Sequence, residues 1–160
     1  MQRPDVLNLI HDDLIFFDHE ATTFKEMIGQ ISGVLHDMGY VKKSYGDAVI
    51  EREKVFPTGL ETKCFPVAIP HADRDHVIQN AIAIIRLKNP ITFTVMATAD
   101  EFVEAQMVFI LAIKESEGQL NTLKNFMAIF SDDAVLFKLR DAESPAKAGE
   151  IIRNFIRDNG

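Results

Sequence analysis

Apolar residues near the N-terminus recur first at the spacing of a strand and then at that of a helix. Residues 14–18 form a short apolar run typical of a strand. Thr23 and Glu26 match the capping box, in which two side chains bond backbone amides at a helix start. Gly39 is suited to end that helix in the left-handed conformation. Between these signals, apolar residues at helical spacing predict a helix: Phe24, Met27, Ile28, Ile31, Val34, Leu35 and Met38.

A second helix is predicted from about Ser44 to the residue before Pro57, because Pro57 and Gly59 break the helical pattern. At about 100° per residue, Arg52 falls in the middle of the apolar face of this helix. That face is expected to consist of Tyr45, Ala48, Val49, Val55 and Phe56.

Four further short runs of β-branched or apolar residues predict four more strands, at 66–69, 81–87, 91–96 and 107–113. The last run is apolar at every position, which is typical of a central strand covered on both faces. Together with residues 14–18, these runs predict a sheet of about five strands.

Helical spacing returns in the last third of the chain. One helix is expected from Gln119, and Ser131 is expected to cap a short helix that ends at Leu139. Ser144 and Pro145 are the expected cap and first residue of a final helix. The apolar stripes are Leu120, Leu123, Met127 and Phe130, and then Ala148, Ile151, Ile152, Phe155 and Ile156. The chain is therefore predicted to be α/β (or α+β), with a mixed sheet flanked by helices on both faces.

Length and charge restrict the function classes. The 160 residues suffice for one sizeable core, and no repeat or linker divides them, so we expect a single domain over 1–160. The net charge is −7 and no run of Lys and Arg appears, which argues against nucleic-acid binding. The longest apolar run, 107–113, is too short to cross a bilayer, and no export signal is visible. Cys64, the one cysteine, forms no internal disulfide, so a cytoplasmic location is expected.

Two residues, Arg52 and His71, are the candidates for a binding or reactive role. Arg52 lies within an apolar face, so its guanidinium either snorkels to water, meets a buried carboxylate, or faces a cleft that binds an anion. His71 follows a short apolar strand that stops at Pro70, and strand ends are where α/β proteins place reactive groups. A neutral imidazole is a nitrogen nucleophile and can accept a phosphoryl group directly.

Competing interpretations of the same region are weaker. His71, Asp73 and His76 include three possible metal ligands, but no further motif completes a site. Cys64 and His71 could pair as thiol and base, although seven residues of separation fix no geometry. Neither a dinucleotide-binding glycine motif nor a Walker motif is present, so no nucleotide, other cofactor or metal is expected.

The sequence resembles a known family, the enzyme IIA component of the bacterial phosphoenolpyruvate-dependent sugar phosphotransferase system (PTS), fructose/mannitol type (type 2). The matching stretches are residues 50–60, Ile-Glu-Arg-Glu-Lys-Val-Phe-Pro-Thr-Gly-Leu, and residues 67–72, Val-Ala-Ile-Pro-His-Ala. The resemblance implies that His71 takes a phosphoryl group from the carrier protein HPr and passes it to a cysteine of a IIB component. The IIB component then phosphorylates a sugar that enters through a membrane IIC component.

The resemblance also implies a phosphoryl pocket. Arg52 matches the arginine beside the active histidine, and backbone amides around Thr58 and Gly59 are expected to assist it. Asp73 either orients His71 or caps a turn. Many relatives carry a second histidine where this chain has Gln119, and galactitol-type IIA proteins resemble it in carrying Gln there, which favours galactitol or a related polyol. The alternatives are a regulatory IIA of the nitrogen-related type and an interaction module in which His71 is only structural.

Overall fold

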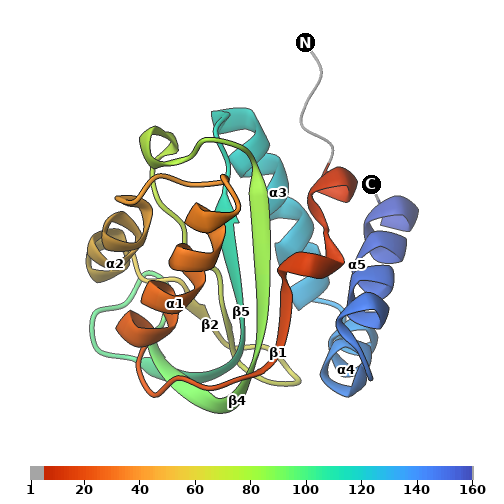
Figure 1. Cartoon of the computed structure of the whole chain (residues 1–160). Coiled ribbons are helices and arrows are strands. Elements are labelled where there is room, and N and C mark those ends of the chain that lie inside the picture. The colour runs from red at the N-terminus through yellow and green to blue at the C-terminus, as the bar shows by residue number, and fades with distance from the viewer. Residues whose placement is uncertain (1–5, 160) are drawn as a thin grey trace.

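The computed structural model describes residues 6–159, and its centre is a five-stranded mixed sheet in the order β1-β4-β5-β3-β2 (Figure 1). The strands are β1 (Ile15–His19), β2 (Gly59–Leu60), β3 (Val67–Ala68), β4 (Ala81–Thr94) and β5 (Phe102–Ala112). The helices are α1 (Phe24–Asp37), α2 (Tyr45–Val55), α3 (Ser116–Phe130), α4 (Asp133–Asp141) and α5 (Pro145–Asn159). β4 and β5 form an antiparallel hairpin, whereas β1 pairs parallel with β4, and β3 parallel with β5. The predicted fold class is confirmed.

Helices cover both faces of the sheet, α1 and α2 on one side and α3, α4 and α5 on the other (Figure 1). The side chains of β5 alternate between the two resulting cores: Val108 and Ile110 face α1 and α2, and Phe109 and Leu111 face the other layer. The prediction that this run is a central strand buried on both faces is confirmed.

The start and end of α1 follow the predicted signals. Thr23 Oγ1 accepts a hydrogen bond from the Glu26 amide at 3.1 Å. The Glu26 carboxylate accepts from the Thr22 amide at 3.0 Å, one residue earlier than the capping-box pattern. Gly39 adopts φ +87°, the left-handed conformation expected just beyond the helix end.

Three strand predictions are wrong in detail. β5 begins at Phe102, five residues before the predicted start at residue 107. Residues 81–94 form one strand rather than two, because β4 continues past Pro90 through a register shift between Arg86 and Ile91. The two-residue strand β2, Gly59–Leu60, lies where no strand was predicted. A strand of two residues is too short to show an alternating pattern.

Three helix predictions are also corrected. Val55 and Phe56 at the end of α2 are 68% and 58% exposed, so they do not belong to a buried face. α3 begins at Ser116 rather than Gln119, and its buried residues include Thr122, Phe126 and Ile129, while Leu120 and Met127 are exposed. The cap of α4 is Asp132, which accepts from the Val135 amide, rather than Ser131. α5 begins at Pro145 as predicted, with Ser144 Oγ accepting from the Lys147 amide.

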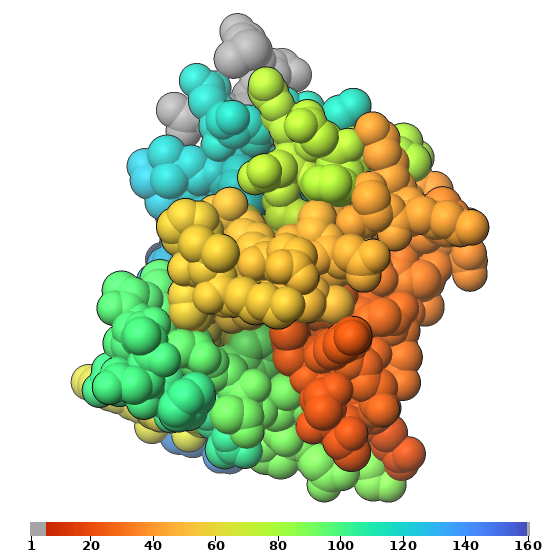
Figure 2. Space-filling view, turned by 90° about the vertical axis from the view of Figure 1, so that its left-hand side faces the viewer, coloured from red at the N-terminus to blue at the C-terminus, as the bar shows by residue number. Residues whose placement is uncertain are grey.

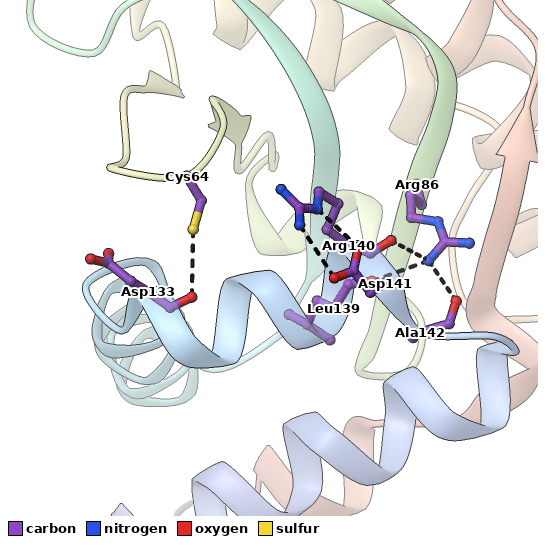
Figure 3. Close-up of polar contacts among 7 residues, drawn as sticks. All are labelled: Cys64, Arg86, Asp133, Leu139, Arg140, Asp141 and Ala142. Carbon is purple, nitrogen blue, oxygen red and sulfur yellow. Dashed lines mark hydrogen bonds and ion pairs between the residues drawn. The ribbon is translucent and has the colours of Figure 1, made fainter.

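Two arginines attach the C-terminal helices to the rest of the fold. Arg86 of β4 donates to the carbonyls of Leu139, Arg140 and Ala142 at the end of α4 (Figure 3). Arg153 of α5 donates to the Ile10 carbonyl and forms an ion pair with Asp12 at 3.1 Å. Both guanidiniums donate to backbone carbonyls at or near the ends of helices, where intrahelical donors are few.

Candidate functional site

An open cleft of about 590 Å³ lies where α2, the segment after β3 and the start of α3 meet. In Figure 2, α2 crosses the middle of the face shown, and the segment after β3 lies above it. The residues that line the cleft are Arg52, His71, Ala72, Asp73, Arg74, Asp75, Ile113, Lys114, Glu115, Ser116, Gln119, Leu120 and Leu123. Four of the six predicted site residues, Arg52, His71, Asp73 and Gln119, are thus brought together.

The position of His71 follows from the short strand before it. β3 runs parallel to β5, so the carboxyl ends of both strands lie at one edge of the sheet. The Leu111 amide donates to the Pro70 carbonyl at 3.1 Å, and His71 bridges to Leu111. This edge is the usual place for reactive groups in α/β folds.

The imidazole of His71 is held in one tautomer. Nδ1 lies 3.0 Å from the Ile69 carbonyl oxygen, which can only accept, so Nδ1 carries the proton and Nε2 keeps its lone pair. Burial is the main cause that lowers the pKa of His71 below its ordinary value of 6.5, and the charge of Arg52 adds to the effect. His71 is therefore neutral at neutral pH, with a free nitrogen nucleophile.

Arg52 faces the cleft, which is one of the three arrangements left open by its position in the helix. Its side chain is 35% exposed, stacks against the Phe56 ring at 5.0 Å and forms an ion pair with Asp73 at 3.5 Å. The Nε atom is buried and lacks a hydrogen-bond partner. A buried donor without a partner is rare. The exposed part of the same guanidinium can bind an anion in the cleft.

Asp73 forms neither of the two contacts expected for it, a bond that orients His71 or a bond that caps a turn. Its carboxylate contacts Arg52, while the Ile69 carbonyl is the group that orients His71. Asp73 precedes the short 3-10 helix Arg74–His76 but makes no side-chain capping bond there. Its negative charge therefore acts on Arg52 and, through space, partly offsets the lowering of the His71 pKa.

Gln119 lies in the first turn of α3 and lines the same cleft. Its Oε1 atom is buried and without a hydrogen-bond partner. Because an amide carries donors and an acceptor, rotation about its last bond presents the NH₂ group to the same place. Gln119 therefore adds an uncharged amide, with donors and an acceptor, to the lining of the cleft.

Thr58 and Gly59 are not among the residues that line the cleft. Thr58 is buried, and both its amide and its hydroxyl donate to the Glu53 carboxylate, at 2.7 and 2.8 Å. Gly59 lies in β2, where a Cβ would come within 2.7 Å of the Thr94 carbonyl oxygen. The sequence interpretation missed Glu53, because it stands among the charged residues Glu51, Arg52 and Lys54 and no local pattern marks it as buried. Burial raises the pKa of Glu53 to about 7.

The competing chemistries have little support. Within residues 6–159, no group of three His, Cys, Asp or Glu side chains is placed to hold a metal. His76 Nδ1 instead lies 2.7 Å from Ser44 Oγ. The Cys64 thiol donates to the Asp133 carbonyl at the start of α4 (Figure 3), and burial together with the Asp133 charge raises its pKa, which disfavours a nucleophilic thiolate.

Comparison with known proteins identifies the family. Residues 8–155 match the family described as "Phosphoenolpyruvate-dependent sugar phosphotransferase system, EIIA 2". This chain belongs to that family. Within residues 6–159, every helix is too short or too polar to cross a membrane.

Two curated relatives and one solved structure show the range of this EIIA family. The chain is 34% identical over 112 residues to the transcriptional regulator ManR of Bacillus subtilis, covering 70% of this chain and 16% of ManR. It is 30% identical over 99 residues to the galactitol-specific EIIA component of Escherichia coli, covering 62% of this chain and 65% of that protein. The matched stretches thus span less than two thirds of either relative.

The structural comparison concerns the fold. The mannitol enzyme IIA from the Escherichia coli complex with phosphorylated mannitol enzyme IIB superposes with a TM-score of 0.72 at 23% identity. The superposition covers 89% of this chain and 95% of that one. The EIIA fold of the present chain is therefore the one found in a IIA protein that binds a IIB component.

Proposed function

We propose that this EIIA chain is a cytoplasmic phosphocarrier of the sugar phosphotransferase system, with His71 as the residue that is phosphorylated. The proposal rests above all on one observation: a neutral imidazole, with Nδ1 bonded to the Ile69 carbonyl, shares a cleft with an arginine that has an unpartnered buried donor. Membership of the EIIA family supports it.

In the proposed reaction, the lone pair of His71 Nε2 attacks the phosphorus of phosphohistidine on HPr. The N–P bond to HPr breaks as the N–P bond to His71 forms, and Nδ1 keeps its proton throughout. Arg52 donates to the equatorial oxygens, where negative charge is spread in the transition state. Gln119 donates from the α3 side, and the exposed Asp73 gives up its contact with Arg52 to the incoming group. In the second step a IIB cysteine thiolate attacks the same phosphorus and His71 leaves.

The sugar proposed for this system is galactitol or a related polyol. The 30% identity to the galactitol-specific EIIA component supports this choice, as does Gln119 at the position of the second histidine of many relatives. Under this proposal a IIB protein is the direct acceptor and a membrane IIC component the indirect one.

A regulatory role is the second candidate. The similarity to ManR, a transcriptional regulator, favours it because the matched stretch covers 70% of this chain. The His71 chemistry would be the same, as it would be for a nitrogen-related IIA. The difference lies in what reads the phosphorylated form.

A transfer experiment separates these roles. The protein is loaded with labelled phosphoryl groups from phosphoenolpyruvate, enzyme I and HPr, freed of HPr, and then mixed with purified galactitol-specific or mannitol-specific IIB. A carrier loses its label to one IIB within seconds and to the other much more slowly. Retention of label with every IIB tested would favour the regulatory role, and failure of the protein to load would contradict both.

A further inference from the structure

We infer that Glu53 is a positioning residue for His71, acting through Thr58 and the backbone of Ile69; the inference rests on the proposed function for its effect on phosphoryl transfer. Glu53 lies on α2, next to Arg52 in sequence, but does not line the cleft. Its role is to lock the two elements that carry Arg52 and His71 in one relative position.

Hydrogen bonds join Glu53 to the imidazole, with the backbone of Ile69 as the covalent link between two of them. The Thr58 amide and hydroxyl donate to the two carboxylate oxygens at 2.7 and 2.8 Å. The Ile69 amide donates to Thr58 Oγ1 at 3.3 Å. The Ile69 carbonyl then accepts the proton of His71 Nδ1 at 3.0 Å. The last of these bonds is the one that fixes the tautomer of the proposed nucleophile.

The backbone before His71 depends on this support. β3 ends at Ala68, so residues 69–71 lie beyond the regular strand. On one side the Leu111 amide holds the Pro70 carbonyl. On the other side the neighbouring strand is β2, which is only two residues long. The Ile69 amide donates there to the carbonyl and the hydroxyl of Thr58. Without the Glu53–Thr58 bonds, the Thr58 hydroxyl that contacts the Ile69 amide is no longer tied to α2.

A carboxylate suits this place better than an amide. Thr58 offers two donors, and two acceptor oxygens satisfy both at once. A glutamine supplies one acceptor and one donor group, so the Thr58 hydroxyl would have to turn and accept from the glutamine NH₂, and its own proton would lose its partner. Both Glu53 oxygens are thus engaged, and the segment at Thr58 is held at two points.

The test combines the imidazole tautomer with the transfer rate. Glu53→Gln and Thr58→Val remove parts of the chain of bonds, Thr58→Ser keeps the hydroxyl, and Glu51→Gln is the matched control on the same helix. Long-range ¹⁵N–¹H NMR correlations report the His71 tautomer in each folded variant. Rapid-quench assays with phospho-HPr as donor report the transfer rate.

We expect Glu53→Gln and Thr58→Val to raise the population of the Nε2–H tautomer and to slow transfer about 10- to 100-fold, the scale seen when supporting residues are lost. Thr58→Ser and Glu51→Gln should match the wild type in both measurements. Wild-type tautomer populations in Glu53→Gln and Thr58→Val would overturn the inference, whatever the rate. If the wild type accepts no phosphoryl group, the proposed function fails, but the tautomer measurement still decides whether Glu53 positions His71. If Thr58→Val does not fold, the measurements on Glu53→Gln decide the question alone.

Discussion

Replacing Arg52 with alanine separates its role in transfer from its role in stability. The ion pair with Asp73 spans 3.5 Å, and the two side chains are 35% and 76% exposed. Exposed pairs of this kind contribute only about 0–1 kcal/mol to stability. The stacking partner Phe56 is itself 58% exposed, so little buried packing is lost. The free energy of unfolding should therefore change by about 1 kcal/mol or less.

The effect on transfer should be far larger. Loss of one preorganised donor to a developing charge lowers a rate by about 10²- to 10³-fold. Arg52→Lys keeps the charge but lacks the Nε donor that has no partner in the unliganded protein, so we expect an intermediate rate. Single-turnover transfer from phospho-HPr, measured by rapid quench beside a urea unfolding curve, gives both quantities.

The matched control is Lys54→Ala, which removes an exposed cation two residues away that pairs with Glu51 instead. Transfer by this variant should stay near the wild-type rate. Two results would refute the reasoning about Arg52. Global unfolding of Arg52→Ala would mean that the guanidinium mainly stabilises the fold. An equal loss of transfer rate in Lys54→Ala would mean that the positive charge near the cleft matters and not its position.

Three further predictions follow from the site and the packing. Because burial and Arg52 lower the pKa of His71, the imidazole gains its proton only below the ordinary value of 6.5, and phosphoryl acceptance should fall there for this reason. The pKa of Glu53, which burial raises to about 7, adds a second change near neutral pH, so the profile is also recorded for Glu53→Gln. A half-loss above pH 6.5 that persists in Glu53→Gln would contradict a lowered His71 pKa. Asp73→Asn removes the carboxylate that pairs with Arg52 and so frees Arg52 for the phosphoryl group. The equilibrium of phosphoryl transfer from phospho-HPr, read from gel-separated labelled proteins, should move toward this protein by up to about fivefold, the equivalent of an exposed ion pair. A shift toward HPr would show that Asp73 does not compete with the phosphoryl group for Arg52. Gly59→Ala places a Cβ within 2.7 Å of the Thr94 backbone carbonyl oxygen and should destabilise the fold by about 1–3 kcal/mol in urea unfolding. Gly29→Ala, in a helix with nothing within 4 Å of the new Cβ, should instead stabilise by about 1 kcal/mol, and equal signs for the two glycines would refute this account of packing.

Local signals in the sequence predicted most of the elements. Thr23 and Gly39 bound α1 as expected, because capping bonds and a positive φ depend on adjacent residues only. Errors arose where tertiary contacts decide. Helical spacing placed Leu120 on the buried stripe of α3, but the helix is turned so that Thr122 and Phe126 face the core.

For the candidate site, too, local patterns predicted some residues, and contacts between distant residues could not be predicted. A charged residue in a helical face and a histidine after a strand pointed to Arg52 and His71, and the fold brings both into one cleft. The chain of bonds from Glu53 through Thr58 to Ile69 could not be predicted, since it joins residues up to 16 positions apart through side chains and backbone. The neighbour of Asp73 likewise depends on how α2 packs beside the segment after β3.

The central claim is that His71 accepts a phosphoryl group, and intact-mass spectrometry tests it most directly. The protein is incubated with phosphoenolpyruvate, enzyme I and HPr, and its mass is recorded before and after brief acid treatment. The account predicts the gain of one acid-labile phosphoryl group that is absent in His71→Ala. No gain by the wild type in the presence of active HPr, or an undiminished gain by His71→Ala, would contradict it, and the former would leave the interaction-module alternative in the lead.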